Sequence, residues 1–125
     1  MIEITVDRVF ETAERIVAGK EDYVYINMHG DSPAPGSSVD CFYVHHDSPG
    51  CIVGSILHEM GVGLGAMFPH EGSDARQLLM HLEANGVAEV DDLAIIALQQ
   101  MQSNQDSGKT WGESVWETNR TMPID

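Results

Sequence analysis

Asp91-Asp92-Leu93-Ala94-Ile95-Ile96-Ala97-Leu98 is the stretch of sequence that decides the fold class. Its two aspartates carry negative charge, which the helix macrodipole favours at the beginning of a helix. Residues 93–98 are apolar on every face, which is typical of a buried helix, and the run is far shorter than the roughly 18 residues of a membrane span. The stretch therefore predicts a helix at the centre of the fold, with residues 93–98 as its most buried part.

Two amphipathic helices are expected before this stretch. Apolar residues three and four positions apart predict a helix over residues 6–18, with Thr5 as its N-cap. A leucine-rich segment predicts a second helix, opened by Ser73 and Asp74 and stopped at Gly86. The chain around the central stretch is therefore mainly helical.

A last helix is expected after the central one. Thr110 and Glu113 have the spacing of a capping box, which marks the beginning of a helix. Trp111 is expected to pack in the core of the protein. An exposed Trp116, together with Met122, would be a natural anchor for a protein partner, because tryptophan is enriched among the residues that dominate binding energy.

A small β-hairpin is expected in the N-terminal third of the chain. Residues 23–28 are rich in β-formers, residues 31–38 have the composition of a loop, and residues 41–45 indicate a second short strand. A lone two-stranded ribbon is marginal in water, so this hairpin must pack against the helices.

A further helix is expected directly after the hairpin. Ser48 would be its N-cap, Pro49 its first residue and Gly61 its end. Gly54 lies inside this helix, where glycine costs about 1 kcal/mol relative to alanine, and a close neighbouring backbone would explain it. The Gly-rich residues 61–72 are expected to form a loop.

These elements predict a mainly α protein (α+β), with about five helices and one small two-stranded β-hairpin near the N-terminal third. The chain has 125 residues, of which 42% are apolar, and this is enough to fill one core. We therefore expect a single domain over residues 1–125.

The charge balance excludes some partners and favours others. The chain has 20 acidic and 6 basic residues and a formal net charge of -14. Its cations are scattered along the sequence, so direct binding to nucleic acid or to an anionic membrane is disfavoured. A basic protein partner would be steered towards such a surface. The N-terminus has no targeting signal and cysteines are few, so we expect a cytoplasmic protein.

A candidate metal site lies within eighteen residues of sequence. Its members are soft or borderline ligands, as zinc prefers: Cys41, His45, His46, Cys51 and His58. The set contains no Cys-x-x-Cys or His-x-x-x-His pair, so two buried reduced cysteines with histidines near a turn explain the same residues.

Three alternatives for these residues are left open. A disulfide between Cys41 and Cys51 is possible, although a reducing cytoplasm argues against it. Cys51 near a helix N-terminus could be a nucleophile with His45 or His46 as its base. The pair His46-Asp47 occurs in metal-dependent phosphohydrolases, but here it lies at a turn.

Two blocks of the sequence carry a family resemblance. They are Cys41-Phe42-Tyr43-Val44 with Pro49-Gly50-Cys51-Ile52-Val53-Gly54, Leu57 and Gly61-Val62, and Gln99 to Gln105 with Asp106-Ser107-Gly108 and Trp111-Gly112-Glu113-Ser114-Val115. Together they cover about half of the chain and resemble a small actinobacterial and actinobacteriophage protein family, in which alanine is usual where Ser114 stands here. The resemblance implies a phage or prophage setting, a host-cytoplasm location and a small accessory role. It implies no catalytic residues.

The leading hypothesis is therefore a non-enzymatic accessory protein, encoded by a phage or prophage, that binds a host or phage protein and forms a homo-oligomer. One alternative is a zinc-binding module or metal-dependent hydrolase built on the five cysteines and histidines. Another is an acidic mimic of nucleic acid whose carboxylates imitate phosphates.

Overall fold

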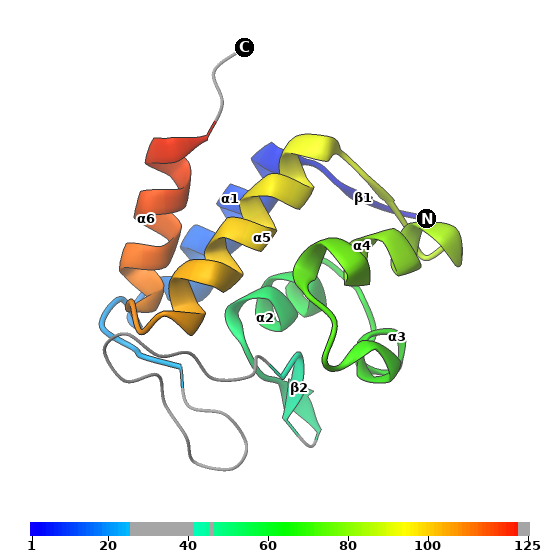
Figure 1. Cartoon of the computed structure of the whole chain (residues 1–125), viewed down its shortest axis with the longest axis horizontal. Coiled ribbons are helices and arrows are strands. Elements are labelled where there is room, and N and C mark those ends of the chain that lie inside the picture. The colour runs from blue at the N-terminus through cyan, green and yellow to red at the C-terminus, as the bar shows by residue number, and fades with distance from the viewer. Residues whose placement is uncertain (26–41, 46, 123–125) are drawn as a thin grey trace.

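The computed structural model describes residues 1–25, 42–45 and 47–122. Within them, six α-helices and the single-turn 3₁₀ helix η1 form most of the chain (Figure 1): α1 (Val6–Val17), α2 (Ile52–Glu59), α3 (Leu64–Met67), η1 (Phe68–His70), α4 (Ala75–Ala84), α5 (Asp92–Asp106) and α6 (Trp111–Thr121). The predicted class, mainly α with a small two-stranded hairpin, is confirmed, with six helices in place of about five.

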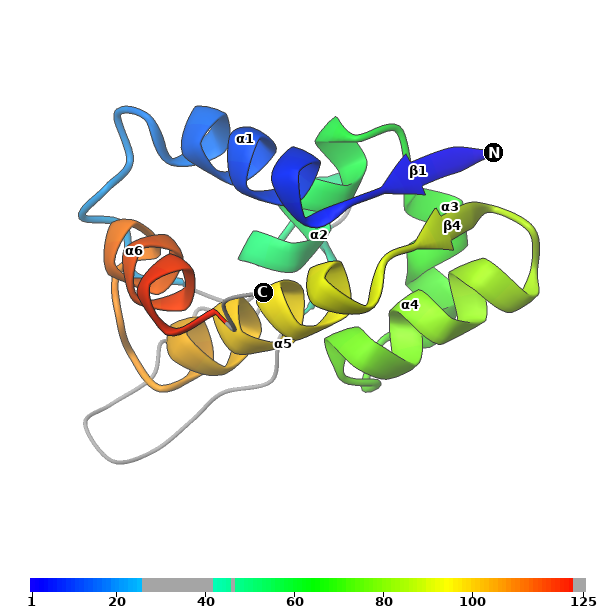
Figure 2. The same ribbon diagram turned by 90° about the horizontal axis from the view of Figure 1, so that it is seen from above.

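Helix α5 occupies the centre of the fold, as the sequence predicts, and packs against α1, α2, α4 and α6 (Figure 2). The prediction that residues 93–98 are its most buried part is wrong, because Ile96 is 46% exposed. Burial instead follows one stripe into the polar second half of the helix: Ala94, Ala97, Leu98, Met101, Gln102, Asn104 and Gln105. A helix contacts its neighbours along one stripe, so an apolar segment still exposes one face and a polar segment still buries one.

A parallel two-stranded sheet joins the beginning of the chain to the middle of it. Strand β1 (Ile2–Ile4) pairs with β4 (Ala88–Val90), and Glu3 stands opposite Glu89 in the register. Each strand leads directly into a helix, so the sheet brings the beginnings of α1 and α5 together (Figure 2). The sequence did not predict these strands, because three residues are too few for alternation to be recognised.

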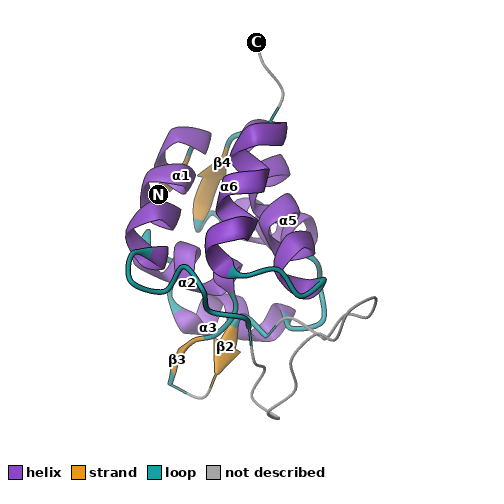
Figure 3. Ribbon diagram, turned by 90° about the vertical axis from the view of Figure 1, so that its left-hand side faces the viewer, coloured by secondary structure: helices purple, strands orange, loops and turns teal. Residues whose placement is uncertain are grey.

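The hairpin lies later in the chain than predicted. Strand β2 (Val44–His45) pairs antiparallel with β3 (Ser48–Pro49), as Figure 3 shows. Of the predicted first strand, residues 23–25 are irregular, and residues 26–28 lie outside the described part. The Tyr25 side chain is fully buried and reaches the hairpin through its hydroxyl group, so this segment is joined to the hairpin by a side chain.

Helix α2 begins three residues later than predicted, since Ser48 and Pro49 belong to β3. Its N-cap residue is Cys51, whose side chain makes no capping hydrogen bond. The expected close backbone beside Gly54 is confirmed, because a Cβ atom there would lie 2.2 Å from the carbonyl oxygen of Tyr43.

The remaining predictions are largely confirmed. Thr5 caps α1, a capping box formed by Asp74 and Gln77 opens α4, and Thr110 caps α6. Residues 61–72 are not simply a loop, since they contain α3 and η1. No helix in the described ranges combines the length and the apolar character that crossing a bilayer requires.

Candidate functional site

Helix α6 lies at the edge of the fold against α5 (Figure 1). It presents one tryptophan to solvent. Trp111 is 3% exposed and belongs to the core, as predicted, whereas Trp116 is 60% exposed. The guanidinium group of Arg120 lies 4.9 Å from the centre of the Trp116 ring, in a cation–π contact. Met122, the second predicted binding residue, is partly buried and packs against the core. Of the two predicted binding residues, Trp116 is therefore the exposed one, and Arg120 lies against its ring.

The five predicted metal ligands are described only in part. Cys41 and His46 lie outside the described residues, and Cys51 is fully buried and disulfide-bonded. His58 is exposed near the end of α2, where its Nδ1 atom lies 3.3 Å from the carbonyl oxygen of Val62. Among the residues that the structure describes, no three histidine, cysteine or acidic side chains converge as metal ligands would.

The disulfide at Cys51 corrects one expectation. The small number of cysteines and the absence of a targeting signal indicated a reducing compartment, in which reduced cysteines are expected. A sulfur in a disulfide is neither a nucleophile nor a zinc ligand, since both roles need the thiolate. In this state of the protein, Cys51 therefore supports neither the hydrolase nor the zinc hypothesis.

His45 is held in a defined position beside a pocket. Its Nε2 atom lies 2.7 Å from the hydroxyl oxygen of Tyr25, and that oxygen also accepts a hydrogen bond of 3.1 Å from the backbone N–H of Phe42. Burial raises the pKa of Tyr25 far above its ordinary value, so this hydroxyl group stays protonated. The pair therefore fixes the imidazole ring without charge on the tyrosine.

The pocket itself has a volume of about 470 Å³. It lies between the segment after α1, the hairpin, and the beginnings of α2 and α6, and its lining includes Lys20, Tyr23, His45, Ser48, Ser55 and Trp111. The rings of Tyr23 and Trp111 meet edge to face, with centroids 4.8 Å apart. The sequence pattern indicated His45 as a site residue and gave no such role to the other lining residues, because the lining comes from four separate segments.

Backbone hydrogen bonds keep the wall of this pocket in place. The first two N–H groups of α6, of Trp111 and Gly112, donate to the carbonyl oxygens of Tyr23 and Glu21. Gly112 allows this approach, because a Cβ atom there would lie 2.8 Å from the Glu21 oxygen. The segment after α1 is thus tied to the start of α6.

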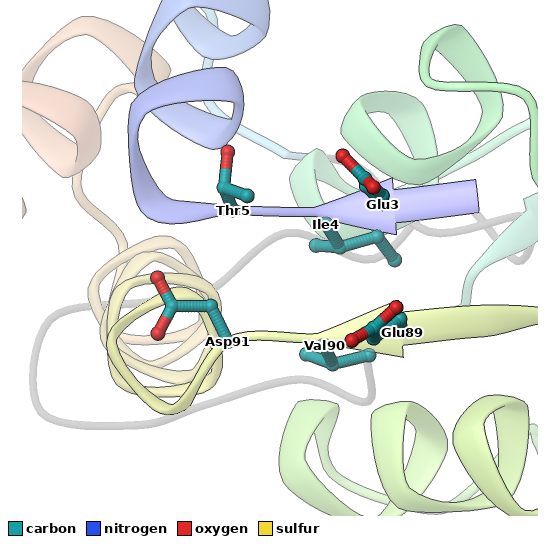
Figure 4. A pocket seen from close by; sticks show the side chains of 6 residues that line it. All are labelled: Glu3, Ile4, Thr5, Glu89, Val90 and Asp91. Atoms are coloured by element: carbon teal, nitrogen blue, oxygen red, sulfur yellow. The ribbon is translucent and has the colours of Figure 1, made fainter.

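A second pocket, of about 310 Å³, lies where β1 and β4 end (Figure 4). Glu3 and Glu89 lie on neighbouring strands, and Asp91 stands at the beginning of α5. The two carboxylate oxygens of Asp91 accept hydrogen bonds from the backbone N–H groups of Val6 and Leu93, at 3.4 and 3.3 Å. Asp91 therefore holds the starts of two helices, and its carboxylate has a structural role.

Buried and partly buried polar side chains join the hairpin to the helices. The Glu71 carboxylate accepts hydrogen bonds from the backbone N–H groups of Tyr43 and Val44, at 2.7 and 3.3 Å. The Tyr43 hydroxyl group donates to the carbonyl oxygen of Ser73 and accepts from the Gln102 side-chain amide. Burial raises the pKa values of Glu71 and Tyr43. Each of these polar groups has a hydrogen-bond partner, which indicates that the network has a structural role.

The fold and its surface define a small acidic helical protein with an exposed tryptophan on α6 and a pocket beside His45. Comparison of the chain with protein-family models, with curated proteins and with solved structures finds no match.

Proposed function

We propose that this protein is a non-enzymatic accessory protein, encoded by a phage or prophage, that binds a host or phage protein through Trp116. The observation that carries the proposal is the 60% exposure of Trp116, on a helix whose other tryptophan is buried. So large an apolar side chain is normally buried in the core of a protein. Tryptophans that are exposed are enriched at the centres of protein interfaces. The resemblance to actinobacteriophage proteins supports the setting.

The partner would carry a basic surface around an apolar pocket. The net charge of -14 attracts cationic proteins over long distances, and Trp116 would fill the apolar pocket at close range. Arg120 already covers part of the ring. Binding therefore requires the partner to displace the guanidinium group or to extend the stack.

To test this, the wild type, Trp116→Ala and Phe68→Ala are each immobilised and exposed to an actinobacterial host lysate. The proteins that each of the three retains are then compared. Phe68 is a matched control, because it is an aromatic residue with 64% exposure on η1. We expect a protein that the wild type and Phe68→Ala retain and that Trp116→Ala loses. With that protein purified, Trp116→Ala should weaken binding about thirtyfold, as the loss of about 2 kcal/mol implies.

Raising the salt concentration should also weaken the complex, since screening reduces the long-range attraction. A capture pattern that Trp116→Ala leaves unchanged would contradict the proposal. So would the absence of any captured protein at low salt. Circular dichroism of the variants confirms that each is folded.

The proposal places the protein in the host cytoplasm, where disulfides are rare. Cys51 is disulfide-bonded in the structure, so the location needs its own test. Cells are quenched in acid and their thiols are alkylated in denaturant, because Cys51 is fully buried in the folded chain. Mass spectrometry should then find Cys51 labelled if the protein is cytoplasmic. Protection of Cys51 from the reagent would instead indicate an oxidising compartment.

We extend the proposal to a homo-oligomer, because small helical domains often bury a spare apolar face in a two-fold dimer. Sedimentation velocity over a wide concentration range tests this part. A monomer at the highest concentration would contradict it, without affecting the proposal for Trp116.

A further inference from the structure

The pocket beside His45 differs in charge from the rest of the chain. Among the described residues that line it, Lys20 is a cation, His45 can become one, and none is acidic. The pocket between β1 and β4 is the opposite case, since Glu3, Glu89 and Asp91 line it. In a chain with 20 acidic and 6 basic residues, a pocket with this charge selects for anions.

Lys20 is suited to bind an anion. Its side chain is exposed at the pocket, and it forms no salt bridge with any described residue. The neighbouring Glu21 is not part of the lining, and its carboxylate accepts a hydrogen bond from the backbone N–H of Gly19. Within the described part of the chain, no ion pair thus cancels the positive charge of Lys20.

Two hydroxyl groups can complete the binding of an oxyanion. Ser48 donates to the carbonyl oxygen of His45 at 3.3 Å, and Ser55 donates to that of Gly50 at 3.4 Å. Both distances are long for hydroxyl donors, which prefer about 2.7–2.8 Å. Either hydroxyl group therefore loses little when it turns towards a charged oxygen, and hydrogen bonds to charged groups are the stronger ones.

The rest of the lining suits a flat apolar group. Tyr23 supplies exposed aromatic surface, and the edge-to-face contact with the buried Trp111 ring fixes its orientation. The volume of about 470 Å³ lies within the range of small-molecule sites, which are largely apolar with a few placed polar groups. A bare inorganic ion would leave most of this space to water.

We propose that this pocket binds a small organic anion, in which a carboxylate or phosphate group is carried on a flat apolar ring. The anionic group meets Lys20 and the hydroxyl groups of Ser48 and Ser55. The ring lies against Tyr23, whose orientation Trp111 fixes from the core. This ligand site is separate from the surface of Trp116 and does not depend on a protein partner.

The test titrates the folded chain with four probes: benzoate, phenyl phosphate, inorganic phosphate and benzylammonium. Binding is followed by two-dimensional NMR, in which the indole N–H signal of Trp111 reports on the pocket and that of Trp116 serves as an internal control. We expect benzoate or phenyl phosphate to shift the signals of Trp111 and Ser55 and to leave Trp116 unchanged. Inorganic phosphate and benzylammonium should bind at least about tenfold more weakly, as the loss of some 1.4 kcal/mol implies.

Lys20→Gln is the decisive variant, because it removes the charge from an exposed side chain and leaves the core intact. We expect it to weaken binding of the aromatic anion about tenfold. Arg76→Gln is the matched control, since Arg76 is an exposed cation on α4 outside the pocket lining, and it should bind as the wild type does. Ser55→Ala should also weaken binding, and its melting temperature shows whether the fold is retained.

Three results would overturn the proposal. The first is the absence of any shift at Trp111 with millimolar anionic probes. The second is equally tight binding of benzylammonium, which would show that the pocket selects for the ring alone. The third is the same affinity for Lys20→Gln and the wild type.

Discussion

At the scale of single residues, Gln105 shows how one side chain can hold several segments. It is fully buried, and its Oε1 atom accepts hydrogen bonds from the backbone N–H of Ile52 at 2.7 Å and from the indole N–H of Trp111 at 3.1 Å. The first bond satisfies a donor at the start of α2 that Cys51 leaves without a side-chain cap. One amide from α5 therefore fixes both α2 and α6.

Gln105→Leu should lower the free energy of unfolding by about 2–5 kcal/mol, because leucine has similar size but leaves two buried donors without acceptors. Urea denaturation, followed by fluorescence, measures the change. Gln99→Leu is the control on the same helix, where the side chain is exposed, and it should change stability by less than about 0.5 kcal/mol. Equal stability of Gln105→Leu and wild type would show that the two hydrogen bonds contribute nothing net.

Two glycines in helices should respond to alanine with opposite signs. Gly54→Ala should destabilise the protein by at least about 1 kcal/mol, because the new methyl group would lie 2.2 Å from the Tyr43 carbonyl oxygen and force the backbone to move. Gly65→Ala should stabilise it by about 0.5–1 kcal/mol, because nothing lies within 4 Å and alanine restricts the unfolded chain. Thermal unfolding of the two variants checks both signs, and destabilisation by Gly65→Ala would contradict the explanation.

At the scale of elements, Glu71 joins β2 to the segment before α4, and its raised pKa gives this joint a pH dependence. A carboxyl group with a raised pKa holds its proton more tightly in the folded chain than in the unfolded chain. Its contribution to the free energy of unfolding therefore falls as the pH rises from its ordinary pKa of 4.5 to the raised value. Above that interval the contribution is constant.

Glu71→Gln removes this titration and leaves all other groups in place. The difference in unfolding free energy, wild type minus Glu71→Gln, should thus decrease as the pH rises through the interval just above 4.5. Urea unfolding at closely spaced pH values measures it. A difference that increases with pH would mean that the two N–H donors outweigh burial and lower the pKa instead.

The parallel pairing of β1 with β4 places Glu3 opposite Glu89, and like charges in this position repel each other. Replacing each residue by glutamine, singly and together, gives a double-mutant cycle that isolates the pair. We expect a repulsive coupling of about 0.5 kcal/mol at low salt, which fades as salt screens it. Strict additivity of the two substitutions at low salt would contradict the observed register.

The elements that sequence analysis predicted are those with long periodic patterns or capping residues, such as α1, α4 and α6. The elements that were missed or misplaced are short. Strands β1 and β4 form by pairing two segments that lie far apart in the chain, and β3 is a two-residue strand in a tight hairpin with β2. The burial of the amide side chains on α5 could have been recognised from the sequence. Leu98, Met101 and Gln105 continue one stripe at helical spacing, so the polarity of Gln105 concealed its burial. The pocket beside His45 had no such signal, since its lining residues are scattered.

At the scale of the whole molecule, the net charge of -14 opposes folding, because the compact state brings like charges closer together. The described salt bridges, Arg15 with Glu59 and Lys109 with Glu117, neutralise little of it. Against this background, two local features stand out: the pocket lined by Lys20, with no acidic residue among its described lining, and the exposed Trp116. The excess of carboxylates favours long-range attraction of cationic proteins, which the proposed partner and the mimic of nucleic acid would both require.

Raising the NaCl concentration from about 10 to 150 mM shortens the screening length from roughly 30 to 8 Å, so it should relieve this repulsion and stabilise the protein. We expect a gain of about 1 kcal/mol, or roughly 4 °C in melting temperature for a chain of this size. The control is a variant with Glu11, Glu14 and Glu89 replaced by glutamine, since all three side chains are exposed. Its gain should be smaller, because less repulsion remains to be screened. An equal gain in both proteins would assign the effect to specific ion binding, and a loss of stability with salt would mean that attractive pairs dominate the folded state.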